Sequence, residues 1–188
     1  MLKTLSEKMF LFSSGRATLA SLILFAAFIG YVLPDQAAKA DAYSNGAGSP
    51  DSSFFYSSSD LYKMAEAYGE DGRAAYVQAR FTFDMIWPLV YLFFLGATIS
   101  WSLGRALPPG SRWRLFNLFP VFGWLFDMCE NISTSAVMLA FPQESFMASL
   151  APIFTLVKWI FVNGSFFILI PAFLAVIWIV RRKDRSVI

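Results

Sequence analysis

Hydrophobic residues gather in four long stretches of this chain, separated by segments in which polar and charged residues dominate. The stretches cover residues 17–33, 83–103, 115–141 and 152–180. Each approaches or exceeds the roughly 20 residues that a helix needs to cross a bilayer. The pattern therefore predicts an all-α integral membrane protein built as a bundle of four transmembrane helices.

The segments between these stretches differ in the sign of their charge. Lysine and arginine occur in the N-terminal segment 1–16, in the connection 104–114 and in the tail 181–188, whereas acidic residues prevail in 34–80 and Glu144 lies in 142–151. Loops rich in lysine and arginine stay on the cytoplasmic side of a membrane. We therefore expect both termini in the cytoplasm and predict a membrane of the bacterial inner, or cytoplasmic, type.

Residues 1–40 also fit a second interpretation, a cleaved secretory signal peptide. A basic start is followed by an apolar run and by Ala38-Lys39-Ala40, which has the small residues of a cleavage site. The apolar run over 17–33 is longer than the usual h-region of about 7–15 residues. Ala26 and Gly30 also offer a small-residue face for helix packing. We favour a retained helix over a cleaved one.

The segment 34–80 between the first two predicted crossings is the longest non-apolar part of the chain. Residues 42–59 are rich in serine and glycine, which is typical of a loop. Further on, Leu61, Met64, Ala65 and Tyr68 recur at helical spacing, and Gly69 interrupts the pattern. We predict an amphipathic helix over about 60–80 on the extracytoplasmic side, between transmembrane helices one and two.

The amino-acid composition excludes several kinds of cofactor and metal site. Charged residues make up 15% of the chain against about 25% in soluble domains. The chain has no histidine and a single cysteine, Cys129, which excludes an intramolecular disulfide, a histidine-ligated haem and a histidine-type zinc site. The cofactor is otherwise undetermined, although a divalent cation is compatible with the carboxylates. Nothing in the pattern of basic residues indicates nucleic-acid binding.

The third hydrophobic stretch carries the most informative polar residues. Asp127, Glu130, Asn131 and Thr134 follow the spacing i, i+3, i+4, i+7, so they share one face of a helix. An ionised carboxylate at the centre of a bilayer costs about 2.5–3.5 kcal/mol even on lenient insertion scales. Two carboxylates one turn apart therefore predict a binding site or a set of polar partners.

Other polar residues fall at a similar predicted depth, in the outer half of the bundle. These are Arg80, Asp84 and Tyr91 on one face of the second crossing and Lys158 on the fourth. The sequence thus predicts an outward-facing pocket for a ligand or an ion, with one carboxylate in excess over the two basic residues. Oxygen ligands suit Mg²⁺ or Mn²⁺, so Asp84, Asp127 and Glu130 are a candidate metal set.

Simpler roles compete with this prediction. The polar residues of the third stretch could be hydrogen-bonding contacts that only hold helices together. Lys158 could extend its amine to the outer headgroups, and Arg80 with Asp84 could form an ordinary interfacial salt bridge.

Three classes of function follow. We favour a membrane protein that binds, or helps to transport, a proton- or cation-linked small molecule or lipid. A membrane-embedded, Mg- or Mn-dependent enzyme acting on a lipid or a small substrate is the first alternative. A structural or accessory subunit is the second. Expected partners are the lipid bilayer, a small-molecule or lipid ligand, and further subunits in a homo-oligomer or a larger membrane complex.

Overall fold

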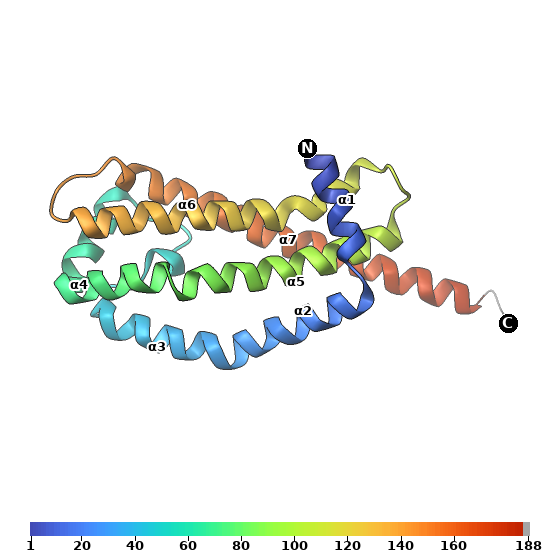
Figure 1. Cartoon of the computed structure of the whole chain (residues 1–188), viewed down its shortest axis with the longest axis horizontal. Coiled ribbons are helices and arrows are strands. Elements are labelled where there is room, and N and C mark those ends of the chain that lie inside the picture. The colour runs from blue at the N-terminus through green and yellow to red at the C-terminus, as the bar shows by residue number, and fades with distance from the viewer. Residues whose placement is uncertain (186–188) are drawn as a thin grey trace. The chain divides into compact units, whose positions relative to one another are not determined.

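The computed structural model describes the backbone of residues 1–185 and the side chains of residues 1–182, and this part of the chain is helical, without strands (Figure 1). Of the predicted tail 181–188, residues 186–188 lie outside the described residues. The α-helices are α1 (Leu2–Phe12), α2 (Gly15–Ala27), α3 (Leu33–Ser44), α4 (Ser58–Arg80), α5 (Phe83–Ala106), α6 (Phe119–Ala140) and α7 (Met147–Arg185). Short helical turns are η1 (Phe28–Val32), η2 (Pro50–Ser52) and η3 (Arg112–Leu118).

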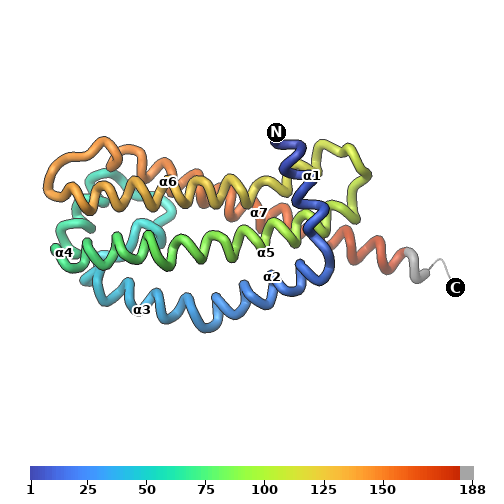
Figure 2. The backbone as a smooth tube through the Cα atoms, in the orientation of Figure 1, coloured from blue at the N-terminus to red at the C-terminus, as the bar shows by residue number. Residues whose placement is uncertain are grey.

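The first hydrophobic stretch belongs to a helix that runs well past its predicted end. The apolar stretch that predicts this crossing ends at Leu33. Instead, α2, the π-helical turn η1 and α3 form one continuous helical segment, Gly15–Ser44 (Figure 2). Pro34 falls at the start of α3, where its missing N–H is tolerated directly after the irregular turn.

Within the described residues, three helical segments are long and apolar enough to cross a membrane: Gly15–Ser44, Ser58–Ala106 and Met147–Arg182. They include three of the four predicted crossings. The remaining one, over 115–141, corresponds to η3 and α6. The central residues Asp127, Glu130 and Asn131 reduce the apolar character of α6. Its role as a fourth crossing stays a prediction.

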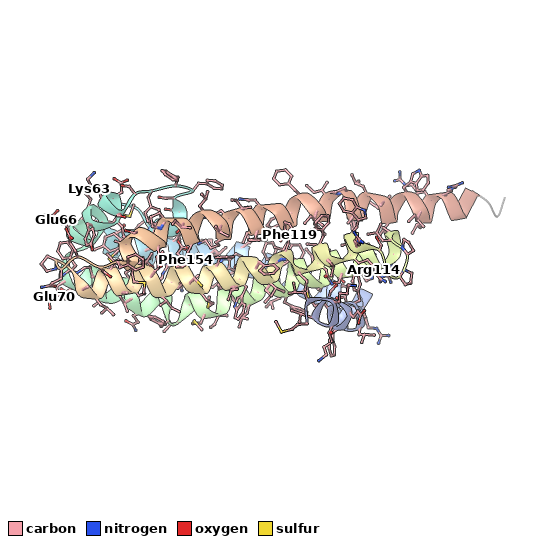
Figure 3. The ribbon with its side chains drawn as sticks, turned by 90° about the horizontal axis from the view of Figure 1, so that it is seen from above. Lys63, Glu66, Glu70, Arg114, Phe119 and Phe154 are labelled. Carbon is pink, nitrogen blue, oxygen red and sulfur yellow. The ribbon has the colours of Figure 1, made fainter. Side chains whose placement is uncertain are left out.

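The helix that the apolar stripe predicts over about 60–80 is present as α4. Ser57 and Asp60 form a reciprocal capping box at its start, which satisfies backbone N–H groups that the first turn leaves free. Leu61, Ala65 and Tyr68 are buried. Gly69 has φ 66° and ψ −176°, so the helix is kinked where the sequence predicts a break. Lys63, Glu66 and Glu70 project outward (Figure 3).

The chain divides into two compact units, and α5, α6 and α7 each contribute to both. Unit 1 comprises Met1–Phe25, Val90–Phe122 and Phe161–Ile188, and unit 2 comprises Ala26–Leu89 and Gly123–Ile160. The core of unit 2 combines α4 with parts of α6 and α7. Its buried members are Tyr56, Leu61, Ala65, Tyr68, Tyr76, Val137, Met138, Ala148 and Ala151.

In unit 1, α1 docks through a small set of neutral polar contacts. Asn117, fully buried, donates to the Ser6 carbonyl oxygen at 3.1 Å and to Ser100 Oγ at 3.1 Å, while Ser6 Oγ donates to Asn117 Oδ1 at 2.7 Å. We call Ser6, Ser100 and Asn117 the Asn117 cluster. Both amide hydrogens and the amide oxygen of Asn117 are thus engaged, so α1 is held without a buried charge.

Candidate functional site: a buried carboxylate cluster

The four polar residues of the third stretch lie on the buried side of α6. Asp127, Glu130, Asn131 and Thr134 are all buried. The opposite side of the same helix is apolar and exposed, with Leu125, Ile132 and Leu139 on its surface. The helical period therefore turns the carboxylates into unit 2 and leaves hydrocarbon outside.

Lys158 lies at the centre of this polar region. Its Nζ is 2.8 Å from Asp51 Oδ1 and 3.7 Å from Asp127 Oδ1, and it also forms an ion pair with Glu130 Oε2. Lys158 is itself buried on α7. Its ammonium group therefore points inward among three carboxylates, which is the opposite of an amine that extends to the headgroups.

Arg80 forms the second basic centre. It pairs with Asp51 and, through Nη2, with Asp84 Oδ2 at 2.7 Å. Its guanidinium also lies over the ring of Tyr76, 4.6 Å from the centroid. Arg80 and Asp84 are both buried, so this pair is more enclosed than an ordinary interfacial salt bridge. We define the carboxylate cluster as Asp51, Asp84, Asp127 and Glu130 together with Arg80 and Lys158.

Asp51 is the member that the sequence does not reveal. It lies in η2 within the serine-rich loop and bridges Arg80 and Lys158, with its side chain 29% exposed. Two contacts anchor the loop on either side of it: Tyr68 OH donates to the Gly48 carbonyl at 2.5 Å, and Ser58 Oγ donates to the Ala148 carbonyl at 2.8 Å. An acid in a polar loop usually faces water, so no local pattern distinguishes Asp51 from its neighbours.

Glu130 has a second set of partners from α7 and the loop. Thr155 Oγ1 lies 2.7 Å from Glu130 Oε1 and 2.9 Å from the Tyr56 hydroxyl. Burial raises the pKa of the Tyr56 phenol above its ordinary value, so the ring stays neutral and available for hydrogen bonding. These contacts fix the orientation of the Glu130 carboxyl group beside Lys158.

The remaining predicted site residues are placed differently. Asn131 Nδ2 donates to the Asp84 carbonyl oxygen at 3.4 Å, while its Oδ1 is buried without a hydrogen-bond partner in the part of the chain that is described. Thr134 Oγ1 donates to the Glu130 carbonyl within α6, at 2.9 Å. Tyr91 is buried in unit 1, whereas every residue of the carboxylate cluster belongs to unit 2.

The charges of the cluster do not balance. Four carboxylates surround two basic side chains, so the acids exceed the bases by two. The sequence alone predicts an excess of one, because it does not include Asp51. In a low-dielectric environment a carboxylate without a cationic partner takes up a proton or a cation. Each carboxylate has a basic partner, but Arg80 and Lys158 together compensate only two of the four negative charges.

Three of the carboxylates are close enough to share a metal ion. One oxygen each from Asp51, Asp127 and Glu130 lies within 4.8 Å of the others, which makes the three carboxylates a candidate set of metal ligands. The metal set predicted from the sequence contains Asp84 in place of Asp51, and Asp84 here pairs with Arg80. The same three carboxylates are those that contact Lys158 Nζ.

Comparison with known proteins yields no significant match, whether to a family model, to a curated protein or to a solved structure. The function of the candidate site is therefore inferred from the residues of the carboxylate cluster themselves.

Proposed function

We propose that this chain is a multi-pass membrane protein whose carboxylate cluster binds a cation, and that it binds or helps to transport a proton- or cation-linked small molecule or lipid. The observation that supports this function is the position of Lys158 Nζ among Asp51, Asp127 and Glu130, in a cluster with two excess carboxylates. The bound species is a proton, an inorganic cation or the ammonium group of a ligand.

The proposal includes α6 as a fourth crossing, with both termini in the cytoplasm. The apolar exposed side of α6, with Leu125, Ile132 and Leu139, suits lipid, while its polar side is turned inward. A topology test uses single cysteines at Gly110 and Ser145 in a Cys129→Ala background. Only the Ser145→Cys site should react with an impermeant thiol reagent added from outside, and the reverse labelling would contradict this orientation.

The position of Lys158 is consistent with a site that binds and releases a cation reversibly. Its ammonium group occupies the position that an incoming cation would take, so the two compete for the same three carboxylates. Binding of a cation would then displace Lys158 from at least one carboxylate, and release would restore the ion pairs. Such an exchange couples occupancy of the site to the position of α7.

A metal-dependent enzyme is the second candidate, and the grouping of Asp51, Asp127 and Glu130 favours it. Three carboxylate oxygens are the ligands that Mg²⁺ and Mn²⁺ prefer, and such an ion could activate a water molecule or polarise a phosphate. This candidate requires the ion to bind where the amine of Lys158 lies.

Binding measurements on the purified full chain in nanodiscs test the proposal. Mn²⁺ and methylammonium serve as probes, with release of protons followed by an indicator dye. Glu130→Gln should weaken binding at least as much as the loss of a residue that only supports a ligand, which costs about 10–100-fold. Glu66→Gln, an exposed acid of α4, is the matched control and should bind as the wild type does.

Lys158→Gln distinguishes a metal ion from a proton or an organic ammonium group as the bound species. A metal site should gain Mn²⁺ affinity when the competing amine is removed, whereas a site for protons or organic ammonium groups should bind no Mn²⁺ in either form. If neither probe binds, no protons are exchanged and Glu130→Gln behaves as the wild type, the proposed function is wrong.

A further inference from the structure

The two units carry opposite charge. Among the residues of unit 1 whose side chains are described, Glu7 is the one acid, against eight basic residues: Lys3, Lys8, Arg16, Arg105, Arg112, Arg114, Arg181 and Arg182. Except for half-buried Arg114, all of these basic side chains are exposed. A surface of this kind attracts anions.

The N-terminal helix α1 lies beside part of this basic surface. It contacts η3, which carries Arg114, labelled in Figure 3. The Arg114 guanidinium stacks over the Phe10 ring at 4.0 Å from the centroid. On α5, a Cβ atom added at Gly96 would lie 3.0 Å from Met9, and one added at Gly104 would lie 3.3 Å from Phe10. Glycines on α5 thus leave room for the two large side chains of α1.

Docking through Ser6, Met9 and Phe10 leaves the rest of α1 uncovered. Leu11 is 83% exposed and Phe12 is 80% exposed, and Lys3 and Lys8 are exposed on the same helix. On η3, Trp113 is 63% exposed next to exposed Arg112. Exposed apolar side chains interspersed with lysine and arginine are typical of helices that lie at the boundary between headgroups and acyl chains.

Stacked arginine–aromatic pairs occur elsewhere in unit 1. Arg105 lies over Trp101 at 4.0 Å, and Arg182 lies over Trp178 at 5.3 Å. Tryptophan and tyrosine are the aromatic residues that are enriched at membrane–water interfaces. An arginine that stacks on such a ring still has several N–H groups that can donate to a phosphate.

We propose that α1 and η3, with the end of α5, form a docking surface for anionic phospholipid headgroups. We call it the basic platform: Lys3, Lys8, Arg105, Arg112, Leu11, Phe12 and Trp113. The basic side chains bind the phosphate groups, and Leu11, Phe12 and Trp113 enter the adjacent acyl region. The partner is the anionic leaflet itself, because basic side chains beside exposed apolar ones match the boundary between charged headgroups and acyl chains.

The test uses the full chain reconstituted in nanodiscs of phosphatidylcholine with increasing phosphatidylglycerol. Bound phosphatidylglycerol is counted by native mass spectrometry after extraction. Each basic residue near an anionic membrane surface contributes about fivefold in affinity. Lys8→Gln with Arg112→Gln should therefore lower the apparent phosphatidylglycerol affinity by about 25-fold. Lys63→Gln, an exposed lysine of α4 in unit 2, is the control and should leave it unchanged.

A spin label at Leu11→Cys in a Cys129→Ala background measures the position of α1 independently of any loss of charge. The proposal expects the label to be accessible to oxygen and protected from a water-soluble nickel chelate when phosphatidylglycerol is present. Accessibility to the chelate would overturn it, because α1 would then face water. Protection from both reagents would also overturn it, since another protein surface would then cover α1. Equal phosphatidylglycerol binding by the double variant, or full competition by soluble glycerol phosphate, would exclude a bilayer docking surface.

Discussion

Each compact unit buries a polar cluster. The two clusters differ in whether their members supply one another with hydrogen-bond partners and balancing charges. The Asn117 cluster of unit 1 is neutral, and every hydrogen-bonding group of the Asn117 side chain has a partner. The carboxylate cluster of unit 2 is ionic, has two excess acids and leaves Asn131 Oδ1 without a hydrogen-bond partner among the described residues. Among the described residues, the members of the neutral cluster thus satisfy one another, whereas the ionic cluster keeps unbalanced charge and a buried acceptor without a partner.

The comparison shows why buried polarity alone does not identify a functional site in a helical membrane protein. Interhelical hydrogen bonds between neutral side chains contribute about 0.6 kcal/mol each on average, which is enough to fix a packing arrangement. Buried charges are a costly way to obtain the same result. The contrast can be tested by removing the central residue of each cluster.

The largest expected change in the free energy of unfolding comes from Lys158→Met. The change removes the ammonium group from Asp51, Asp127 and Glu130 and leaves three neighbouring carboxylates without it. Loss of one partner from a buried ion pair destabilises by about 3–5 kcal/mol. The free energy of unfolding in mixed micelles measures the loss.

Lys63→Met is the matched control for this change. Lys63 pairs with Asp60 on the exposed surface of α4, so its replacement should cost less than about 1 kcal/mol. Adding Asp127→Asn to Lys158→Met should restore part of the lost stability, because one unpartnered charge disappears. If Lys158→Met and Lys63→Met have equal effects, the cluster is not an electrostatic unit.

A smaller effect is expected when the neutral cluster is opened. Asn117→Ala leaves Ser6 and Ser100 without their buried partner, at a cost of about 1–3 kcal/mol. Because Asn117 links α1 to α5, the variant should also expose α1 to trypsin at Lys8. Cation binding at the carboxylate cluster should not change.

Asn163→Ala, at a half-buried asparagine of α7 in unit 1, is the control for this substitution. It should leave cleavage at Lys8 as slow as in the wild type. If Asn117→Ala also abolished cation binding, the two clusters would be coupled and the distinction drawn between them would be lost.

The parts of the site that could be predicted from sequence depend on local periodicity. Asp127, Glu130 and Asn131 are predicted to share a face because helical spacing is fixed by the backbone. Asp51 could not be predicted, because its position depends on distant contacts such as that between Tyr68 and Gly48. Helical spacing places Tyr91 on the same face as Asp84, but Tyr91 is about 10 Å further along the helix, and a shared face gives no information on depth.

The same limit applies to the fold. Hydrophobic length and charge pattern predict the segments that become α2, α5 and α7, since each is long and apolar. They do not predict that residues 2–12 form the separate helix α1. One contact that holds this helix joins Ser6 to Asn117, which is 111 residues away in sequence. They also do not predict that the helix continues beyond Leu33, because the π-helical turn that precedes Pro34 has no signature in the residue pattern.

The smallest expected change in the free energy of unfolding concerns Tyr56, which contacts the carboxylate cluster through Thr155. Tyr56→Phe removes the hydroxyl that lies 2.9 Å from Thr155, while Thr155 keeps its contact with Glu130. One such hydrogen bond is worth about 0.5–1.5 kcal/mol at neutral pH. Tyr31→Phe, on a residue that is 82% exposed, should change the unfolding free energy by less than this.

The pH dependence of the Tyr56 contribution gives the sharper test. Burial holds the pKa of Tyr56 above the ordinary value of 10.0, so the folded state keeps the phenol protonated where the unfolded chain would release the proton. This contribution is therefore complete below pH about 10 and is lost as the pH rises through the folded-state pKa. Unfolding free energies of wild type and Tyr56→Phe at pH about 8 and about 11 should converge toward the higher pH. A constant difference would show that Tyr56 reaches solvent in the folded protein, and the edge of the cluster would then be open to water.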